Sequence, residues 1–211
     1  MLQLTVPGGA DKVLLHACCA PCSGAIIECM LSNGITPVVF FSNSNICPEE
    51  EYNHRRDELR RYCDSLGVEM HEDEYDHEAW LSIATGLENV PERGARCVKC
   101  FRYRLFRAAA WASAHGLRVM TSSLASSRWK NVDQVNNAGA WACSLINETF
   151  PDSEPLVWWS QNWRKGGLQP RRGEIIREQG FYNQTFCGCE FSKHLEEAAA
   201  AAPEEKAPEV F

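Results

Sequence analysis

The sequence lacks the marks of a membrane or exported protein. Its 211 residues contain no apolar run near the roughly 18 residues that suggest a membrane span. The first residues, MLQLTVPGGADK, show no basic segment followed by an apolar core, so we expect no secretory signal and a cytoplasmic location. Hydrophobic residues make up 45% and charged residues 23% of the chain, as in a folded protein of about one domain.

Motifs that bind common nucleotide cofactors are also missing. No G-x-G-x-x-G opens a helix, which argues against a bound nicotinamide or flavin. There is no glycine-rich phosphate loop either, so activation of a substrate by ATP is disfavoured. The formal net charge of −7 argues against a protein that coats nucleic acid nonspecifically.

Positive charge is nevertheless concentrated in two short segments. Five basic residues and no acid lie between Arg96 and Arg107, and five basic residues against Glu174 alone lie between Arg164 and Arg177. Such islands predict a focused site for a polyanion, with solvated helix faces as the alternative. Aromatic residues among them either stack on RNA bases or pack in the core. The candidate RNA contacts are Arg102, Arg104, Arg107, Arg128, Lys130, Arg164 and Lys165.

Short apolar runs alternate with helical segments along the chain. We expect strands at 12–19, 35–45, 68–75 and 117–125, and helices at 23–34, 47–67, 101–115 and 131–146. This alternation predicts βαβ units, hence an α/β fold with a mainly parallel sheet covered by helices on both faces. We expect a single domain over residues 12–192, with a cysteine-rich C-terminal extension and a flexible tail at 193–211.

Cysteine is unusually frequent, with 11 residues in the chain. Because the chain is long enough to build its own core and nothing indicates export, these cysteines point to metal, iron–sulfur or redox chemistry and not to a secreted disulfide framework. Three of them, Cys29, Cys63 and Cys143, lie in expected helices, where a free cysteine is usually a small buried hydrophobe. Cys47 follows an expected strand. The other seven form three local sets: Cys18, Cys19 and Cys22; Cys97 and Cys100; Cys187 and Cys189.

The first two sets predict a metal centre. Ligands gather beyond the carboxyl ends of parallel strands, which is where the first set falls, and a helix N-terminus next to it favours thiolates. Together with the C-x-x-C at Cys97 and Cys100, it can supply four thiolates, which suit zinc or an iron–sulfur cluster. Because the adjacent Cys18 and Cys19 are awkward for tetrahedral zinc, we favour a four-iron cluster.

The Cys187-Gly188-Cys189 sequence predicts a different chemistry. Two cysteines one residue apart can form a disulfide only in a tight, strained ring, for which the glycine supplies backbone freedom. Strained disulfides are easily reduced, which is typical of catalytic or regulatory pairs. The alternative is that both thiols are further metal ligands.

Five ordered motifs resemble those of the QueH-type epoxyqueuosine reductases: HACCAPC, EYNHR, RCVKCFRYRL, TSSLASSRWKN and GEIIREQGFYNQTFCGC. The resemblance spans residues 12–192 and implies a fold similar to the Rossmann-like adenine-nucleotide α-hydrolases. It also implies the last step of queuosine formation, the cobalamin-independent removal of the epoxide oxygen from epoxyqueuosine in the tRNA anticodon loop, with an unidentified electron donor. The implied site residues are Cys18, Cys19, Cys97 and Cys100 as ligands of a [4Fe-4S] cluster, and Cys187 and Cys189 as the redox-active catalytic pair.

The chain departs from that family after its second strand and leaves one thiol without a fixed role. The family commonly has Asn-Pro-Asn-Ile-His-Pro there, whereas this chain has NSNICP at residues 43–48. Cys47 therefore stands where an imidazole is usual. Cys22 either replaces one cluster ligand or holds an additional iron with the Cys187–Cys189 pair.

The chemistry of epoxide removal is consistent with these thiols. It needs two electrons, which a dithiol supplies as it becomes a disulfide, whereas a cluster supplies electrons singly. Two other functions stay open. One is a sulfur-handling or tRNA-thiolating enzyme with persulfides on Cys187 or Cys189, against which the missing phosphate loop counts. The other is a zinc-stabilised RNA-binding module without catalysis.

Overall fold

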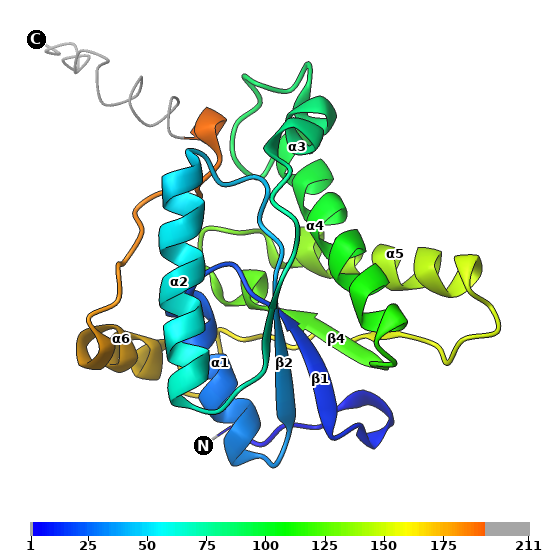
Figure 1. The fold of residues 1–211 in the computed structure, drawn as a ribbon, viewed down its shortest axis with the longest axis vertical. Coiled ribbons are helices and arrows are strands. Elements are labelled where there is room, and N and C mark those ends of the chain that lie inside the picture. The colour runs from blue at the N-terminus through cyan, green and yellow to red at the C-terminus, as the bar shows by residue number, and fades with distance from the viewer. Residues whose placement is uncertain (1, 193–211) are drawn as a thin grey trace, which may run out of the picture.

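In this computed structural model, residues 2–192 are described, and they form one sheet of five parallel strands in the order β3-β2-β1-β4-β5 (Figure 1). The strands are β1 (Lys12–His16), β2 (Thr36–Phe41), β3 (Met70–Glu72), β4 (Val119–Ser122) and β5 (Val157–Trp158). The helices are α1 (Ala20–Ser32), α2 (Glu49–Ser65), α3 (His77–Ala84), α4 (Ala95–Ala114), α5 (Val132–Thr149) and α6 (Leu168–Gln179), with short 3₁₀ turns η1 (Pro7–Gly9) and η2 (Ser123–Ser126). Within the described part of the chain, no helix combines the length and the apolar character needed to cross a bilayer.

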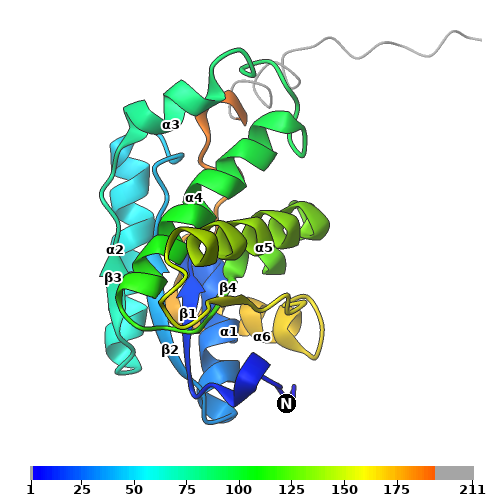
Figure 2. The ribbon, with the colours of Figure 1, turned by 90° about the vertical axis from the view of Figure 1, so that its right-hand side faces the viewer.

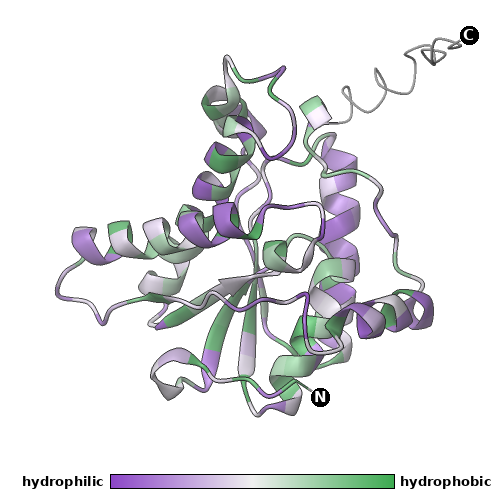
Figure 3. Cartoon of the chain, turned by 180° about the vertical axis from the view of Figure 1, so that it is seen from behind, coloured by the Kyte–Doolittle hydropathy of each residue, from purple (hydrophilic) through white to green (hydrophobic). Residues whose placement is uncertain are grey.

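The centre of the sheet consists of branched and aromatic side chains. In the register of the strands, Leu14 of β1 lies between Val38 of β2 and Met120 of β4, and all three are buried. A parallel strand that is covered on both faces has no solvent side, so its sequence is a continuous apolar run and does not alternate. This is why β1 and β2 are readable from the sequence. In Figure 3 the central strands are hydrophobic, whereas hydrophilic residues gather on the surrounding helices.

Helices cover both faces of the sheet, as predicted. Helix α1 packs against α2 and α6, and α4 packs against α5 on the opposite face (Figures 1 and 2). The strand order explains this division. The chain moves from β1 through β2 to β3 in one direction and from β4 to β5 in the other, so right-handed crossovers put the connecting helices on opposite faces.

The predicted mainly parallel α/β fold is confirmed, but several element boundaries differ. The first strand ends at His16, three residues earlier than expected, and α4 begins at Ala95, six residues earlier than expected. Cys97 and Cys100 therefore lie in the first turns of α4. Helices α3 and α6 and the two-residue strand β5 were not predicted, because each buries few residues and has little apolar periodicity. The tail predicted at 193–211 lies outside the described residues.

The strand order defines where a ligand site is expected. From β1 the chain continues to β2 on one side, while β4 lies on the other side of β1, so the topology switches direction between β1 and β4. Open α/β sheets bind ligands in the crevice beyond the carboxyl ends of the strands at such a point. The segments that leave these ends are residues 17–19 after β1, 42–48 after β2 and η2 after β4.

Candidate active site

Three thiols gather where β1 runs into α1. The Sγ atoms of Cys18, Cys19 and Cys22 all lie within 4.8 Å of one another, and those of Cys18 and Cys19 are 3.8 Å apart. Cys19 is the N-cap residue of α1 and Cys22 lies in its first turn, so one tight strand-to-helix turn brings the three sulfurs together. Ser123, at the end of β4, accepts a hydrogen bond from Cys18 N (3.1 Å) and donates one to Cys18 Sγ (3.4 Å). The group therefore sits at the predicted crevice.

Hydrogen bonds within this group select one thiolate. The thiols of Cys19 and Cys22 stabilise the Cys18 thiolate and hold the pKa of Cys18 well below its ordinary value, although burial opposes the shift. The guanidinium of Arg104 lowers that pKa further. The same hydrogen bonds to Cys18 raise the pKa of Cys19 well above its ordinary value and that of Cys22 to about 12. Of the three thiols, Cys18 is therefore the one whose pKa is lowered.

The second thiol set lies at the N-terminus of α4. Cys97 Sγ accepts a hydrogen bond from Arg93 N (3.3 Å), and Cys100 packs in a small apolar cluster with Trp80 and Cys189. Burial raises the pKa of both Cys97 and Cys100. Arg104, one turn after Cys100, lowers the pKa of Cys18 and opposes the rise at Cys100. Among the described residues, Cys97 and Cys100 do not join the group in which the Sγ atoms of Cys18, Cys19 and Cys22 lie within 4.8 Å of one another.

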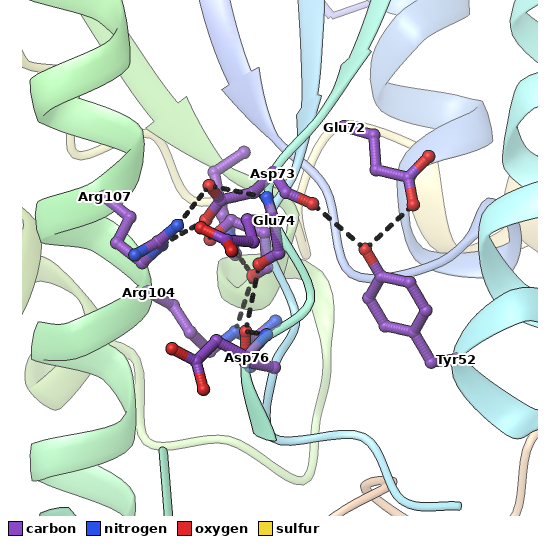
Figure 4. A network of polar contacts seen from close by, with 10 residues as sticks. Tyr52, Glu72, Asp73, Glu74, Asp76, Arg104 and Arg107 are labelled. Atoms are coloured by element: carbon purple, nitrogen blue, oxygen red, sulfur yellow. Dashed lines mark hydrogen bonds and ion pairs between the residues drawn. The ribbon is translucent and has the colours of Figure 1, made fainter. Parts of the chain in front are cut away.

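The burial of Arg104 corrects one predicted RNA contact. Its side chain is 2% exposed and donates hydrogen bonds to the backbone oxygen of Ser42 (3.1 Å) and to the side-chain oxygen of Asn43. A buried guanidinium cannot reach an RNA phosphate, so the prediction for Arg104 is wrong. Arg107 is engaged too, because it donates to Asp73 at 2.7 Å (Figure 4).

The Cys187-Gly188-Cys189 segment packs against α2 and the 128–130 loop. Lys130 Nζ lies 2.6 Å from Cys187 Sγ, and Arg55 Nη1 donates to the backbone oxygen of Cys187 at 3.1 Å. Gly188 has a φ of +95°, which confirms the prediction that this glycine supplies backbone freedom. A Cβ atom on Gly188 would lie 3.0 Å from Ile46 and 3.1 Å from Arg55, so the close approach also requires glycine.

Lys130 is half-buried beside the Cys187 sulfur. Burial disfavours its ammonium form, but the neighbouring Cys187 and Glu92 outweigh this effect and hold the pKa of Lys130 above its ordinary value. The ammonium therefore faces the Cys187 sulfur as a fixed positive charge. Cationic neighbours of this kind favour the reactive thiolate form of cysteine.

Both ends of the chain contribute to one cavity of about 560 Å³. Three thiols line it, from Cys19, Cys22 and Cys187, whereas Cys97 and Cys100 do not. Four cations from three segments of the chain, α2, the loop after η2 and α6, line the same cavity, against the acid Glu92, so the cavity attracts anions. These cations are Arg55, Arg128, Lys130 and Arg172.

The remaining predicted RNA contacts lie in different environments. Arg128 and Lys130 face the cavity as expected, and Arg128 lies 4.8 Å from the centre of the Trp129 ring, which is 61% exposed. Arg164 instead stabilises the loop of residues 127–130, because it donates hydrogen bonds to the backbone oxygens of Ser127 and Lys130. Arg102 and Lys165 are exposed, with Arg102 over the ring of Trp141. Of the interleaved aromatics, Phe101, Trp163 and Phe181 belong to the core.

Sequence reasoning missed two residues that shape the site. Arg55 lies in the quoted EYNHR motif and Ser123 in TSSLASSRWKN, so their motifs were visible but their partners were not. The contacts of Arg55 and Ser123 join segments that are distant in the sequence, and no local pattern marks such pairs. Arg172, which belongs to the second basic segment, also lines the cavity and donates to Asn183 at 3.1 Å.

Comparison with known proteins identifies the relatives of this chain. The family model described as "Epoxyqueuosine reductase QueH" matches residues 13–195. An epoxyqueuosine reductase QueH of Acinetobacter baylyi is 43% identical over 90% of this chain and 84% of its own length. That of Haemophilus influenzae is 42% identical over 90% of this chain and 75% of its own. The chain belongs to the QueH family of epoxyqueuosine reductases. The predicted oxidoreductase of queuosine biosynthesis is thereby confirmed and favoured over the thiolating enzyme and the zinc-stabilised module.

A solved structure supports the fold of this QueH family member. The U34-tRNA thiolase NcsA from Methanococcus maripaludis, solved with its [4Fe-4S] cluster, matches with a TM-score of 0.50 over 92% of this chain and 68% of its own. At 10% sequence identity the likeness shows the fold alone. The predicted Rossmann-like, adenine-nucleotide α-hydrolase-like architecture is confirmed.

Proposed function

We propose that this chain reduces epoxyqueuosine in the anticodon loop of tRNA to queuosine, the last step of queuosine formation, without cobalamin. The observation that carries the proposal is a cavity that is lined both by the thiols of Cys19, Cys22 and Cys187 and by four cationic side chains. A modified nucleoside fits a cavity of about 560 Å³, and the flanking phosphates of its RNA match the positive charge. Membership of the QueH family supports the same reaction.

The thiols of this site fit a [4Fe-4S] cluster. Thiolate sulfur is the ligand type that such clusters take, and Cys18, Cys19 and Cys22 bring three buried or half-buried sulfurs within 4.8 Å of one another. We assign Cys18, Cys19, Cys97 and Cys100 as its ligands because the HACCAPC and RCVKC motifs that contain them resemble those of the QueH family. When bound, the cluster supplies single electrons from an external donor. Cys22 then faces the cavity as a candidate ligand of an additional iron.

In our proposal the Cys187 and Cys189 thiols carry out the two-electron step. Both carbon–oxygen bonds of the epoxide break, a carbon–carbon double bond forms, and the oxygen leaves as water with one proton from the Cys189 thiol and one from the Lys130 ammonium. The two sulfurs are oxidised as a disulfide bond forms between them, and Gly188 permits the tight ring. Lys130 Nζ, 2.6 Å from Cys187 Sγ, stabilises the attacking thiolate and holds a proton for the departing oxygen.

Recognition of the tRNA is assigned to the rim of the cavity. Arg128 and Arg172 line it from two elements, and Trp129 offers an exposed ring on which an unpaired loop base can stack. Arg102 and Lys165 provide further exposed charge. Arg104 has no part in this surface.

The test is mass spectrometry of nucleosides from tRNA that carries epoxyqueuosine, after anaerobic incubation with cluster-loaded protein and a reductant. We expect conversion to queuosine without added cobalamin, and no multiple turnover by the Cys187→Ser variant. Cys143→Ala is the matched control, since Cys143 is buried in α5 and lines no part of the cavity. Unchanged epoxyqueuosine with the cluster-loaded wild-type chain would contradict the proposal.

A further inference from the structure

A second group of metal-ligating side chains lies outside the cavity. The ligand atoms of Cys47, His77 and Glu190 all lie within 4.8 Å of one another. The three residues come from the loop after β2, from the first residue of α3 and from the position directly after Cys189. All three side chains are half-buried, and none of them lines the cavity. The group therefore needs an explanation of its own.

The ring of His77 is oriented as a metal ligand. Its Nδ1 lies 2.7 Å from the backbone oxygen of Ser44, and because a carbonyl oxygen only accepts, Nδ1 carries the proton. In the neutral ring, Nε2 then presents a lone pair to Glu190 Oε1 at 3.1 Å, where two acceptors face each other. A cation between them resolves that conflict. Metal-bound histidines usually donate their other N–H to a backbone carbonyl or carboxylate, as His77 does here.

We propose that Cys47, His77 and Glu190 bind one zinc ion, with a water molecule as the fourth ligand. Zinc takes thiolate, imidazole and carboxylate ligands together, whereas calcium and magnesium prefer oxygen alone. The Nε2–Oε1 distance of 3.1 Å is near the edge of about 3.3 Å expected between nitrogen and oxygen ligands of tetrahedral zinc. The His77 and Glu190 side chains are 17% and 29% exposed, so water and the ion reach the site.

The site connects the Cys187–Cys189 segment to the loop after β2 and to α3. Glu190 follows Cys189 directly, and Cys47 N donates to the backbone oxygen of Gly188 at 2.9 Å. A zinc ion here fixes the Cys187–Cys189 segment to the loop after β2 and to α3. It touches neither the cavity nor the cluster thiols, so its role is positioning. Zinc binding does not depend on the proposed function. The consequence of zinc binding for the reaction, through the position of Cys187 and Cys189, does rest on the proposed function.

The first experiment measures zinc on the cluster-loaded chain. Protein with its iron in place is stripped of loosely bound metal with a chelator and titrated anaerobically with Zn²⁺ against a chromophoric zinc chelator. We expect one zinc per chain. Glu190→Gln and His77→Gln should each bind it at least tenfold more weakly with unchanged iron content. Glu69→Gln is the matched control, because Glu69 and His71 form a 2.6 Å histidine–carboxylate pair without a cysteine.

The second measurement keeps the test independent of how the variants fold. X-ray absorption at the zinc edge of the wild-type chain should show one sulfur at about 2.3 Å and nitrogen or oxygen ligands at about 2.0–2.2 Å. Zinc should also slow amide exchange over residues 186–190 in the wild type and not in Glu190→Gln. Equal zinc affinity in wild type and Glu190→Gln, or a zinc shell of sulfur alone, would overturn the proposal and leave His77–Glu190 as an ion pair only.

Discussion

At the scale of single residues, Lys130 Nζ lies 2.6 Å from Cys187 Sγ. We expect Lys130→Met to slow alkylation of Cys187 by iodoacetamide roughly tenfold near neutral pH, because the half-buried sulfur loses the neighbouring positive charge. Peptide mass spectrometry measures the rate at each thiol. Lys130→Arg keeps the charge and should keep most of the rate. Equal rates in wild type and Lys130→Met would remove Lys130 from this role.

Gly188 makes a second prediction at this scale. Alanine at Gly188 meets both a left-handed φ of +95° and contacts of 3.0 Å and 3.1 Å, so the 187–189 segment must move. We expect Gly188→Ala to abolish the Cys187–Cys189 bridge in air-oxidised protein while iron content is retained. Gly180→Ala is the control, since Gly180 also has positive φ but no atom within 4 Å of the added Cβ. It should cost about 1–2 kcal/mol and leave the bridge intact.

Single residues were predictable where spacing alone brings them together, and not where burial decides. The sets Cys18–Cys22 and Cys187–Cys189 are local in sequence, so their grouping was visible. Arg104 and Arg107 look like Arg102 in the sequence, yet only the direction in which α4 faces the sheet decides which of them is buried. The acidic segment after β3 also takes Arg107 as its partner through Asp73.

At the scale of elements, the pairing of α5 with β5 depends on Gly139. A Cβ atom there would lie 2.3 Å from the ring of Trp158, so helix and strand approach closely. We expect Gly139→Ala to lower the free energy of unfolding by about 1–3 kcal/mol, as overpacking does. In Gly173→Ala, on α6, the nearest atom is 3.6 Å from the added Cβ, and this variant should gain about 0.5–1 kcal/mol. Urea unfolding of both variants measures the difference, and equal shifts would contradict the packing argument.

The docking of α6 on α1 carries a pH-dependent contribution. Arg171 donates to Glu28 at 2.7 Å and, with Tyr62, lowers the pKa of the Glu28 carboxyl. Because the pKa of Glu28 is lower in the folded than in the unfolded chain, the charged carboxylate stabilises the fold at every pH above its ordinary pKa of 4.5. This stabilisation is lost as the pH falls through the lower pKa of the folded state. The pair is partly solvated, so the interaction is modest. Between pH 7 and pH 5, the free energy of unfolding of the wild type should exceed that of Glu28→Gln by about 0.5–1 kcal/mol.

Urea unfolding as a function of pH tests this sign. The difference in free energy of unfolding between wild type and Glu28→Gln should become smaller below about pH 4.5. Glu154→Gln, whose partner Arg118 lies on an exposed surface, should show little gap at any pH. A gap that grows as the pH falls would contradict the argument.

Elements were predictable in proportion to their burial. Strands β1 and β2 and helices α1 and α2 were expected near their observed places, because each buries most of one face or both. Helix α6 buries only Leu168 and Ile175, and its position depends on ion pairs with α1 that no periodicity reveals. The β5 strand exists because it pairs with β4, which is a tertiary and not a local property.

At the scale of the whole molecule, an acidic chain presents a cationic cavity. We expect Arg128→Gln with Arg172→Gln to weaken binding of an anticodon stem-loop and to reduce its salt slope by up to about 1.4, at about 0.7 per phosphate contact on single-stranded RNA. Fluorescence anisotropy at several salt concentrations measures the slope. Arg118→Gln is the control, because Arg118 precedes β4 at the opposite end of the sheet. An unchanged slope in the double variant would direct the search for the RNA surface elsewhere.

The order of the site along the chain has a consequence for how the protein is made. Of the three sets of thiols, Cys18 and Cys19 leave the ribosome first, Cys97 and Cys100 follow, and the Cys187 segment comes last. At about 5–20 residues per second, the four thiols that we assign to the cluster exist for several seconds before the last segment that lines the cavity is translated. A nascent chain stalled after β5 therefore already carries the thiols that we assign to the cluster, but it lacks residues 183–187, which line one side of the cavity. We therefore expect factors that deliver iron and sulfide to reach these thiols most easily during synthesis, before residues 183–187 complete the lining of the cavity.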